Sequence, residues 1–196
     1  MRAERLVHRV CNSQTVEVID EPTYTFGSQH NRSRYQREQI LDEPQFQLTS
    51  RHGVISTLNG DPLASVIFGA TGGASGVHQH SLATLEDRGF LAVGPFIVCL
   101  DLPTLSTRWV QVVDDATCFG IHICPDRRSL ISHGELEISR LTLSGDILWQ
   151  GGGPDIFTGS LSFASSAVLV EDFNGDTLSF DLETGDSILK RRPTSC

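Results

Sequence analysis

Three segments of the chain repeat one pattern, and each begins 40 residues after the one before it. They are CLDLPTLSTRW (Cys99 to Trp109), SRLTLSGDILW (Ser139 to Trp149) and SFDLETGDSIL (Ser179 to Leu189), and they align without a gap. A fixed period of this length is the sequence signature of a repeat architecture, in which each unit stacks on its neighbours. The repeat therefore constrains the fold more than any single predicted element does.

Four positions recur within the copies. Asp101, Leu141 and Asp181 correspond, as do Thr104, Ser144 and Thr184, then Leu105, Gly145 and Gly185, and finally Trp109, Trp149 and Leu189. We interpret NGDPLASVIFG (Asn59 to Gly69) as a fourth, eroded copy at the same offset, with Asp61 in the Asp position. The large apolar residue that ends each copy is expected to fill the same slot between neighbouring units.

Each copy predicts a β-hairpin. An apolar or alternating strand comes first, as in FIVCLDL, LEISRLTL and DTLSFDL. A polar turn follows, most clearly at Glu183-Thr184-Gly185-Asp186, where glycine can adopt a positive φ. The second strand carries the Trp or Leu, and a further apolar run precedes each hairpin (GFLAV, SLIS and AVLVED). Three or four short strands per 40 residues match the size of one β-propeller blade.

The copies resemble the repeat of quinoprotein-type (PQQ-like) β-propellers, whose motif is A-x-D-x-x-T-G-x-x-x-W. Ser179 to Leu189 matches this motif apart from Ala to Ser and Trp to Leu, whereas Cys99 to Trp109 has Leu105 where Gly is usual. Ser139 to Trp149 keeps Gly145 and the Trp but has Leu141 in place of the Asp. The resemblance implies a fold and leaves the chemistry open, because propellers host unrelated functions.

The expected fold is therefore all-β, built from antiparallel repeats in a single domain of 196 residues. We place the repeats near 53–90, 91–130, 131–170 and 171–190, and interpret 28–46 as a polar irregular or helical insert. Propellers typically have four to eight blades, so this chain predicts a small or incomplete propeller. An open β-repeat array and a half-ring completed by a second copy are the alternatives.

Composition excludes several classes of partner. A net charge of -9 argues against nucleic-acid binding, which requires clustered Lys and Arg. No run of 18 apolar residues is present, so we expect no membrane-spanning segment. The N-terminal segment MRAERLVHRV has no apolar stretch typical of a secretory signal, and the five cysteines are irregularly spaced. These features predict a cytoplasmic protein with reduced thiols.

The segment GGASGVHQH contains the candidate metal ligands. On a strand, His78 and His80 would point to the same face and could share a metal ion. With Glu86 they resemble the first motif of the cupins, although the later gaps are about one residue too long. His122 and His133 are available as a further ligand, and the candidate set is His78, His80, Glu86 and His122. The structural alternative is a glycine-rich loop with exposed or backbone-bonded histidines.

Two functions follow. The first is a non-enzymatic interaction or scaffold protein with a protein partner and no cofactor. The second is a metal-binding protein or cupin-like metalloenzyme that uses the His78 and His80 pair with a divalent metal. The chain has no G-x-S-x-G elbow, which favours the first function but leaves enzyme activity open. A quinone-cofactor dehydrogenase is disfavoured because the chain is short for such a ring and has no adjacent cysteine pair. Open sheet edges would favour a homodimer.

Overall fold

The computed structural model describes residues 5–10, 14–42 and 47–191. These residues form four sheets, and none of them lies in a helix that could cross a membrane. The first sheet has the strand order β1-β2-β4-β5-β3 and is antiparallel except for β3. Its strands are β1 (Arg5–Val10), β2 (Gln14–Asp20), β3 (Arg37–Ile40), β4 (Ser50–Leu58) and β5 (Asp61–Ala70).

The other three sheets are four-stranded antiparallel meanders in chain order. The second contains β6 (Leu82–Leu85), β7 (Arg88–Val93), β8 (Phe96–Asp101) and β9 (Thr107–Val112). The third contains β10 (Cys118–Ile123), β11 (Ser129–Gly134), β12 (Glu137–Thr142) and β13 (Ile147–Gly152). The fourth contains β14 (Leu161–Phe163), β15 (Ala167–Glu171), β16 (Thr177–Asp181) and β17 (Ser187–Lys190).

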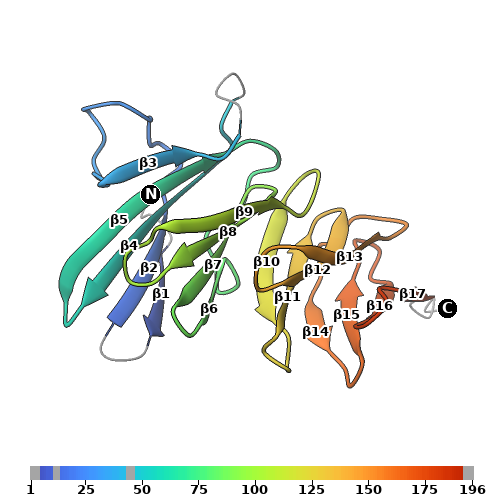
Figure 1. Cartoon of the computed structure of the whole chain (residues 1–196). Coiled ribbons are helices and arrows are strands. Elements are labelled where there is room, and N and C mark those ends of the chain that lie inside the picture. The colour runs from blue at the N-terminus through green and yellow to red at the C-terminus, as the bar shows by residue number, and fades with distance from the viewer. Residues whose placement is uncertain (1–4, 11–13, 43–46, 192–196) are drawn as a thin grey trace.

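The four sheets, numbered here as blades 1 to 4, lie side by side in chain order, with the first and last at opposite ends (Figure 1). This arrangement confirms the predicted all-β, incomplete propeller-like fold. The predicted hairpins appear as the pairs β8–β9, β12–β13 and β16–β17. The predicted repeats are out of phase with the blades, because the 91–130 repeat begins within β7 of blade 2 and ends within β11 of blade 3.

The segment 28–46 differs from the prediction of an irregular or helical insert. Residues 37–40 form β3, which pairs in parallel with β5 because the outer edge of β5 offers free backbone groups. Two aromatic rings of the surrounding loop cover glycines of this sheet: Tyr35 lies over Gly53 and Phe26 over Gly69. The loop thereby caps the face of blade 1 that points away from blade 2. Residues 43–46 lie outside the described residues.

The ungapped alignment is one residue wrong in the middle copy. Three hydrogen bonds close the hairpin turns, from Asp101 N to Ser106 O, from Thr142 N to Asp146 O and from Asp181 N to Asp186 O. The middle turn is one residue shorter, so Thr142 and not Leu141 stands in the Asp position. The Thr142 hydroxyl accepts hydrogen bonds from the turn amides of Ser144 and Asp146, as the Asp181 carboxylate does in its own turn.

The fourth copy also needs correction. Its register places a turn at Ala64 and Ser65, but these residues lie within the continuous strand β5. The turn of this hairpin is instead at Asn59 and Gly60, whose φ values of 53° and 91° are typical of a tight asparagine–glycine turn. The local turn chemistry therefore overrides the 40-residue offset.

Three apolar clusters form the core, one at each joint between successive blades. The first joins β2, β4 and β5 to blade 2, the second joins blade 2 to blade 3, and the third joins blade 3 to blade 4. Strands of blades 2 and 3 are consequently buried on both faces, as in the pattern BBBBBi of β8. We call these three interfaces seams 1/2, 2/3 and 3/4.

The recurring tryptophans act as joints between blades. The Trp109 ring lies on Gly145 of the next blade, where an added Cβ would come within 2.8 Å of the ring. Trp149 lies on Gly185 in the same way. The indole N–H of Trp109 donates to Leu143 O (3.2 Å), and that of Trp149 donates to Leu182 O (2.9 Å). The predicted slot between units is therefore confirmed for both tryptophans.

The prediction that Leu189 fills the slot between units, as the tryptophans do, is wrong. In blades 2 and 3 a bulge adds one residue to the outer strand just before the tryptophan. The β16–β17 pair has no bulge, and so Ile188, opposite Ser179, occupies the tryptophan position. Leu189 pairs with Leu178 on the other face of the sheet. Ile188 is 66% exposed, because no described blade follows it.

Candidate functional site: a histidine pocket in seam 3/4

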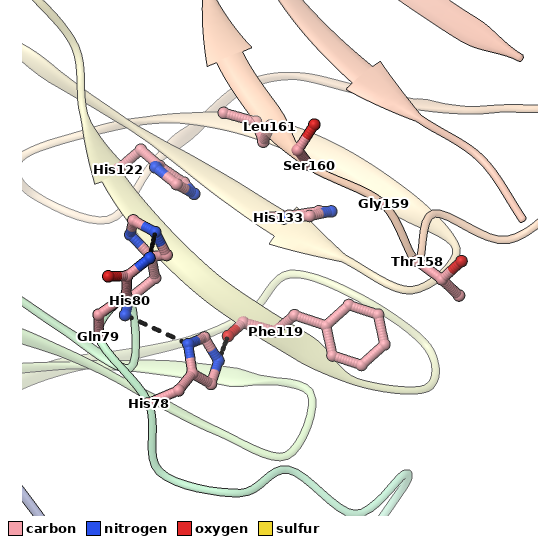
Figure 2. Close-up of a pocket in the computed structure, with 10 residues that line it drawn as sticks. All are labelled: His78, Gln79, His80, Phe119, His122, His133, Thr158, Gly159, Ser160 and Leu161. Atoms are coloured by element: carbon pink, nitrogen blue, oxygen red, sulfur yellow. Dashed lines mark hydrogen bonds between the residues drawn. The ribbon is translucent and has the colours of Figure 1, made fainter. Parts of the chain in front are cut away.

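A pocket of about 540 Å³ opens between β10 and β11 of blade 3 and the segment that leads into β14 of blade 4 (Figure 2). The loop before β6 closes one side of it. Four histidines and several uncharged residues line it: His78, Gln79, His80, Phe119, His122, His133, Thr158, Gly159, Ser160 and Leu161. The pocket therefore brings together residues from three blades that lie far apart in the sequence.

Strand pairing explains why His122 and His133 reach this pocket. His122 on β10 is paired with Ile131, and His133 on β11 is paired with Ile138. Cross-strand partners project from the same face of a sheet, and Ile131 and Ile138 belong to the apolar cluster of seam 3/4. Both histidines therefore face blade 4, at the end of the seam where the apolar packing stops.

The Nε2 atoms of His122 and His133 are buried and have no hydrogen-bond partner among the described residues. His133 as a whole is only 9% exposed. Burial, together with a smaller effect of the neighbouring histidines, lowers the pKa of His122 to about 3 and that of His133 to about 4. Both rings are neutral at pH 7, so each Nε2 can donate or accept according to its tautomer.

His78 and His80 do not lie on a strand, which removes the argument that they share a face. The backbone N–H of His80 donates to His78 Nδ1 (3.3 Å), so His78 carries its proton on Nε2 and donates it to Phe119 O (2.5 Å). The Gln79 amide donates to His80 Nε2 (2.9 Å). These nitrogens are already engaged, unlike those of His122 and His133.

The histidines nevertheless form one cluster. The ring centroids are 6.1 Å apart for His78 and His80, 4.5 Å for His80 and His122, and 6.3 Å for His122 and His133. Glu86 does not join them: it lies in the β6–β7 turn with a φ of 56°. Among the described residues, no three His, Cys, Asp or Glu side chains form a group that could hold a metal ion. The metal-binding alternative is therefore not supported.

Sequence reasoning named His78, His80 and His122 as one set but left His133 as a spare ligand. The position of His133 on its strand could have indicated that it belongs to this site. His133 and Ile131 are two residues apart on β11 and therefore face the same seam. No sequence pattern indicated that Thr158 and Ser160 line the pocket, because they belong to an irregular segment whose position is set by the packing of blade 4 on blade 3.

Comparison with known proteins supports the fold. No protein-family model matches the sequence, and no curated protein is detectably similar to it. The structure is similar to BamB from Moraxella catarrhalis, with a TM-score of 0.55 and 16% identity over 96% of this chain and 63% of that one. It is also similar to the β-propeller domain of Myceliophteria thermophila Cps50 (Swd1), with a TM-score of 0.53 and 8% identity over 73% of this chain and 57% of that one.

These two likenesses define the chain as a β-propeller-like repeat protein, in agreement with its PQQ-like motif. A quinohemoprotein alcohol dehydrogenase from Comamonas testosteroni is matched over 20% of its length, with a TM-score of 0.46 and 13% identity. The chain spans less than two thirds of the length of each of these three solved chains.

Proposed function

We propose that this protein is a non-enzymatic interaction module that binds a segment of a protein partner at the histidine pocket of seam 3/4. The carrying observation is that the buried Nε2 atoms of His122 and His133 have no hydrogen-bond partner in the part of the chain that the structure describes. More than nine tenths of buried polar groups in native proteins are hydrogen-bonded, and an unpaired one costs about 1–3 kcal/mol. A bound segment would supply the missing partners.

The shape of the site supports this proposal. A pocket of about 540 Å³ lies within the range of typical ligand sites and has room for one or two side chains. Phe119 and Leu161 form an apolar part of the pocket wall, and Thr158 and Ser160 add hydroxyl groups. Stacked β-repeats present concave surfaces of this kind to their partners.

The test is a selection of peptides from a displayed random library on the immobilised protein. We expect enriched peptides that protect β10 and β14 from hydrogen exchange and that bind the His122→Ala/His133→Ala variant at least about tenfold more weakly, a loss of ~1.4 kcal/mol. His30→Ala is the matched control, because His30 is exposed and lies outside the pocket.

Two results would overturn the proposal. One is a library that yields no binder of the wild-type protein. The other is a set of peptides that bind the wild type and the double variant equally and protect other strands.

A further inference from the structure

The geometry points to a carboxylate as the group that the pocket of seam 3/4 binds, held by Nε2–H donors of His122 and His133. This inference deepens the proposed function and rests on it for the partner segment: such a segment would insert an acidic side chain or its terminal carboxylate.

Every polar side chain of the lining can donate a hydrogen bond. The hydroxyls of Thr158 and Ser160 border the pocket opposite the two histidine rings, which extend toward the start of β14 (Figure 2). A neutral imidazole that carries its proton on Nε2 donates from that atom. A carboxylate is an acceptor with two oxygens and about four lone-pair sites, and so it matches a ring of donors.

No acidic side chain is among the described residues that line the pocket. After burial, the neighbouring histidines are the groups that lower the pKa values of His122 and His133. Glu135 is two residues from His133, and Glu171 packs against Gly159, but neither lines the pocket. The net charge of -9 is therefore carried by side chains that do not line the pocket, although Glu135 and Glu171 lie close to it.

A cation is a poorer match. Both ring nitrogens of His78 and Nε2 of His80 are engaged in hydrogen bonds, and among the described residues no three His, Cys, Asp or Glu side chains form a group that could hold a metal ion. Metal sites in proteins commonly use three or four ligands. A carboxylate needs only the two Nε2–H groups and the hydroxyls.

The repeat itself supplies a control. In seam 2/3 the positions of His122 and His133 are held by Ala83 and Ala92, which occupy the same rungs of the β6–β7–β8 pairing. Alanine is thus compatible with the backbone at both positions. The variant His122→Ala/His133→Ala gives seam 3/4 the same residues that seam 2/3 has at these two positions.

The probes are sodium succinate and its neutral analogue succinamide, titrated by calorimetry and by NMR shifts of the histidine Cε1–H groups in the full 196-residue chain. We expect succinate to bind at least about tenfold more tightly than succinamide. We also expect binding to be lost in His122→Ala/His133→Ala and kept in His30→Ala. The affinity for succinate should rise as the pH falls from about 8 to 6, because a bound anion favours proton uptake by the imidazoles.

His122→Gln/His133→Gln is the second variant. Glutamine keeps an N–H donor but takes up no proton, so it should retain weak succinate binding without the pH dependence. Thermal unfolding confirms that each variant is folded.

The inference is overturned if succinamide binds as tightly as succinate, if the double alanine variant binds succinate unchanged, or if zinc chloride and not succinate shifts the histidine resonances. Success with peptides that lack a carboxylate would remove this inference and leave the proposed function standing. Binding of succinate without any selected peptide would support carboxylate recognition and remove the peptide partner.

Discussion

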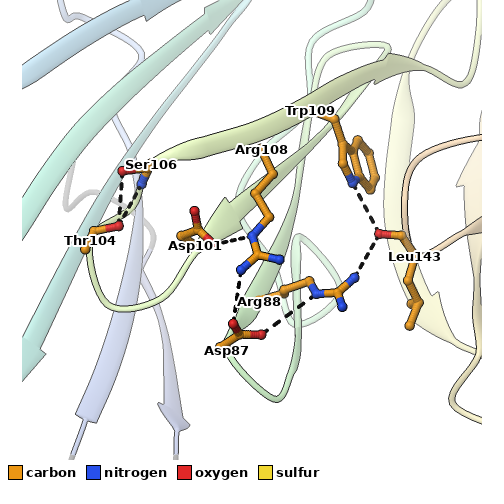
Figure 3. A network of polar contacts seen from close by, with 8 residues as sticks. All are labelled: Asp87, Arg88, Asp101, Thr104, Ser106, Arg108, Trp109 and Leu143. Atoms are coloured by element: carbon orange, nitrogen blue, oxygen red, sulfur yellow. Dashed lines mark hydrogen bonds and ion pairs between the residues drawn. The ribbon is translucent and has the colours of Figure 1, made fainter.

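Seams 2/3 and 3/4 share one scaffold but differ in chemistry. In both, a tryptophan lies on a glycine of the next blade and donates its indole N–H to a backbone carbonyl, as Trp109 does to Leu143 (Figure 3). In each sheet, four cross-strand partners, one from each strand, form a row that ends at the tryptophan, and these rows differ. In seam 2/3 they are Ala83, Phe90, Cys99 and Trp109, and in seam 3/4 they are His122, Ile131, Arg140 and Trp149.

The difference extends beyond the histidines. Cys99 is fully buried, and burial raises the pKa of its thiol to about 11, so it acts as a small apolar side chain. Arg140, at the same rung, is 9% exposed and donates to Ser129 Oγ and to Leu182 O of the next blade. Three positions that are apolar in seam 2/3, namely Ala83, Ala92 and Cys99, are thus polar in seam 3/4, where they are His122, His133 and Arg140. A repeat can acquire a site by changing a few side chains without changing its backbone.

The largest expected effect comes from removing the joint of seam 3/4. Trp149→Ala deletes the ring stacked on Phe180 at 5.9 Å and leaves Leu182 O without its indole donor. We expect the free energy of unfolding to fall by about 3–5 kcal/mol. Urea denaturation measures it, with Leu148→Ala as the control, since Leu148 is exposed on the same strand. A loss below ~1 kcal/mol would show that the seams do not depend on their tryptophans.

Acid should weaken seam 3/4 and spare seam 2/3. The pKa of His133 falls from 6.5 unfolded to about 4 folded, so below pH 6.5 the unfolded chain binds more protons and stability declines toward pH 4. The loss from His133 is on the order of 3 kcal/mol, and His122 adds to it. Denaturation at several pH values tests this. An identical pH profile in His122→Ala/His133→Ala would assign the acid sensitivity to other groups.

Gly185→Ala tests the close contact between the Trp149 ring and Gly185. The added Cβ would lie 2.8 Å from the Trp149 ring, and the backbone φ is 76°. The control is Gly27→Ala, which has nearly the same φ of 74° but open space around its Cβ. We expect about 1 kcal/mol of backbone strain at Gly27 and about 2–3 kcal/mol in total at Gly185. Equal losses at the two glycines would mean that the tryptophan moves aside freely.

The smallest effect should come from the last blade. Ile188 holds the tryptophan position there but faces no described blade, so Ile188→Asp should change the free energy of unfolding by less than about 0.5 kcal/mol. A loss above ~1 kcal/mol in a denaturant titration would reveal that this face is packed in solution, and light scattering would then show whether a second copy covers it.

The sequence by itself determined the period, the hairpins and the joints. Regular spacing, apolar alternation and the Thr-Gly turn are local signals, and Trp109 and Trp149 took the places that their repetition predicts. Local signals also limited the prediction. A single bulge or a shortened turn shifts the register by one residue, which moved the Asp position from Leu141 to Thr142 and the last slot from Leu189 to Ile188.

Only the tertiary structure decided the site. His78 and His80 were visible as a pair, but their loop is held to β10 by the hydrogen bond from Ile121 N to His80 O, and this contact brings them to His122. His133 joined them because β11 pairs with β10 in one register, and Glu86 was left out because it lies in the β6–β7 turn, outside the lining of the pocket. The physical reason is that hairpins form from neighbouring residues, whereas a pocket between blades depends on how whole sheets pack, which no short stretch of sequence encodes.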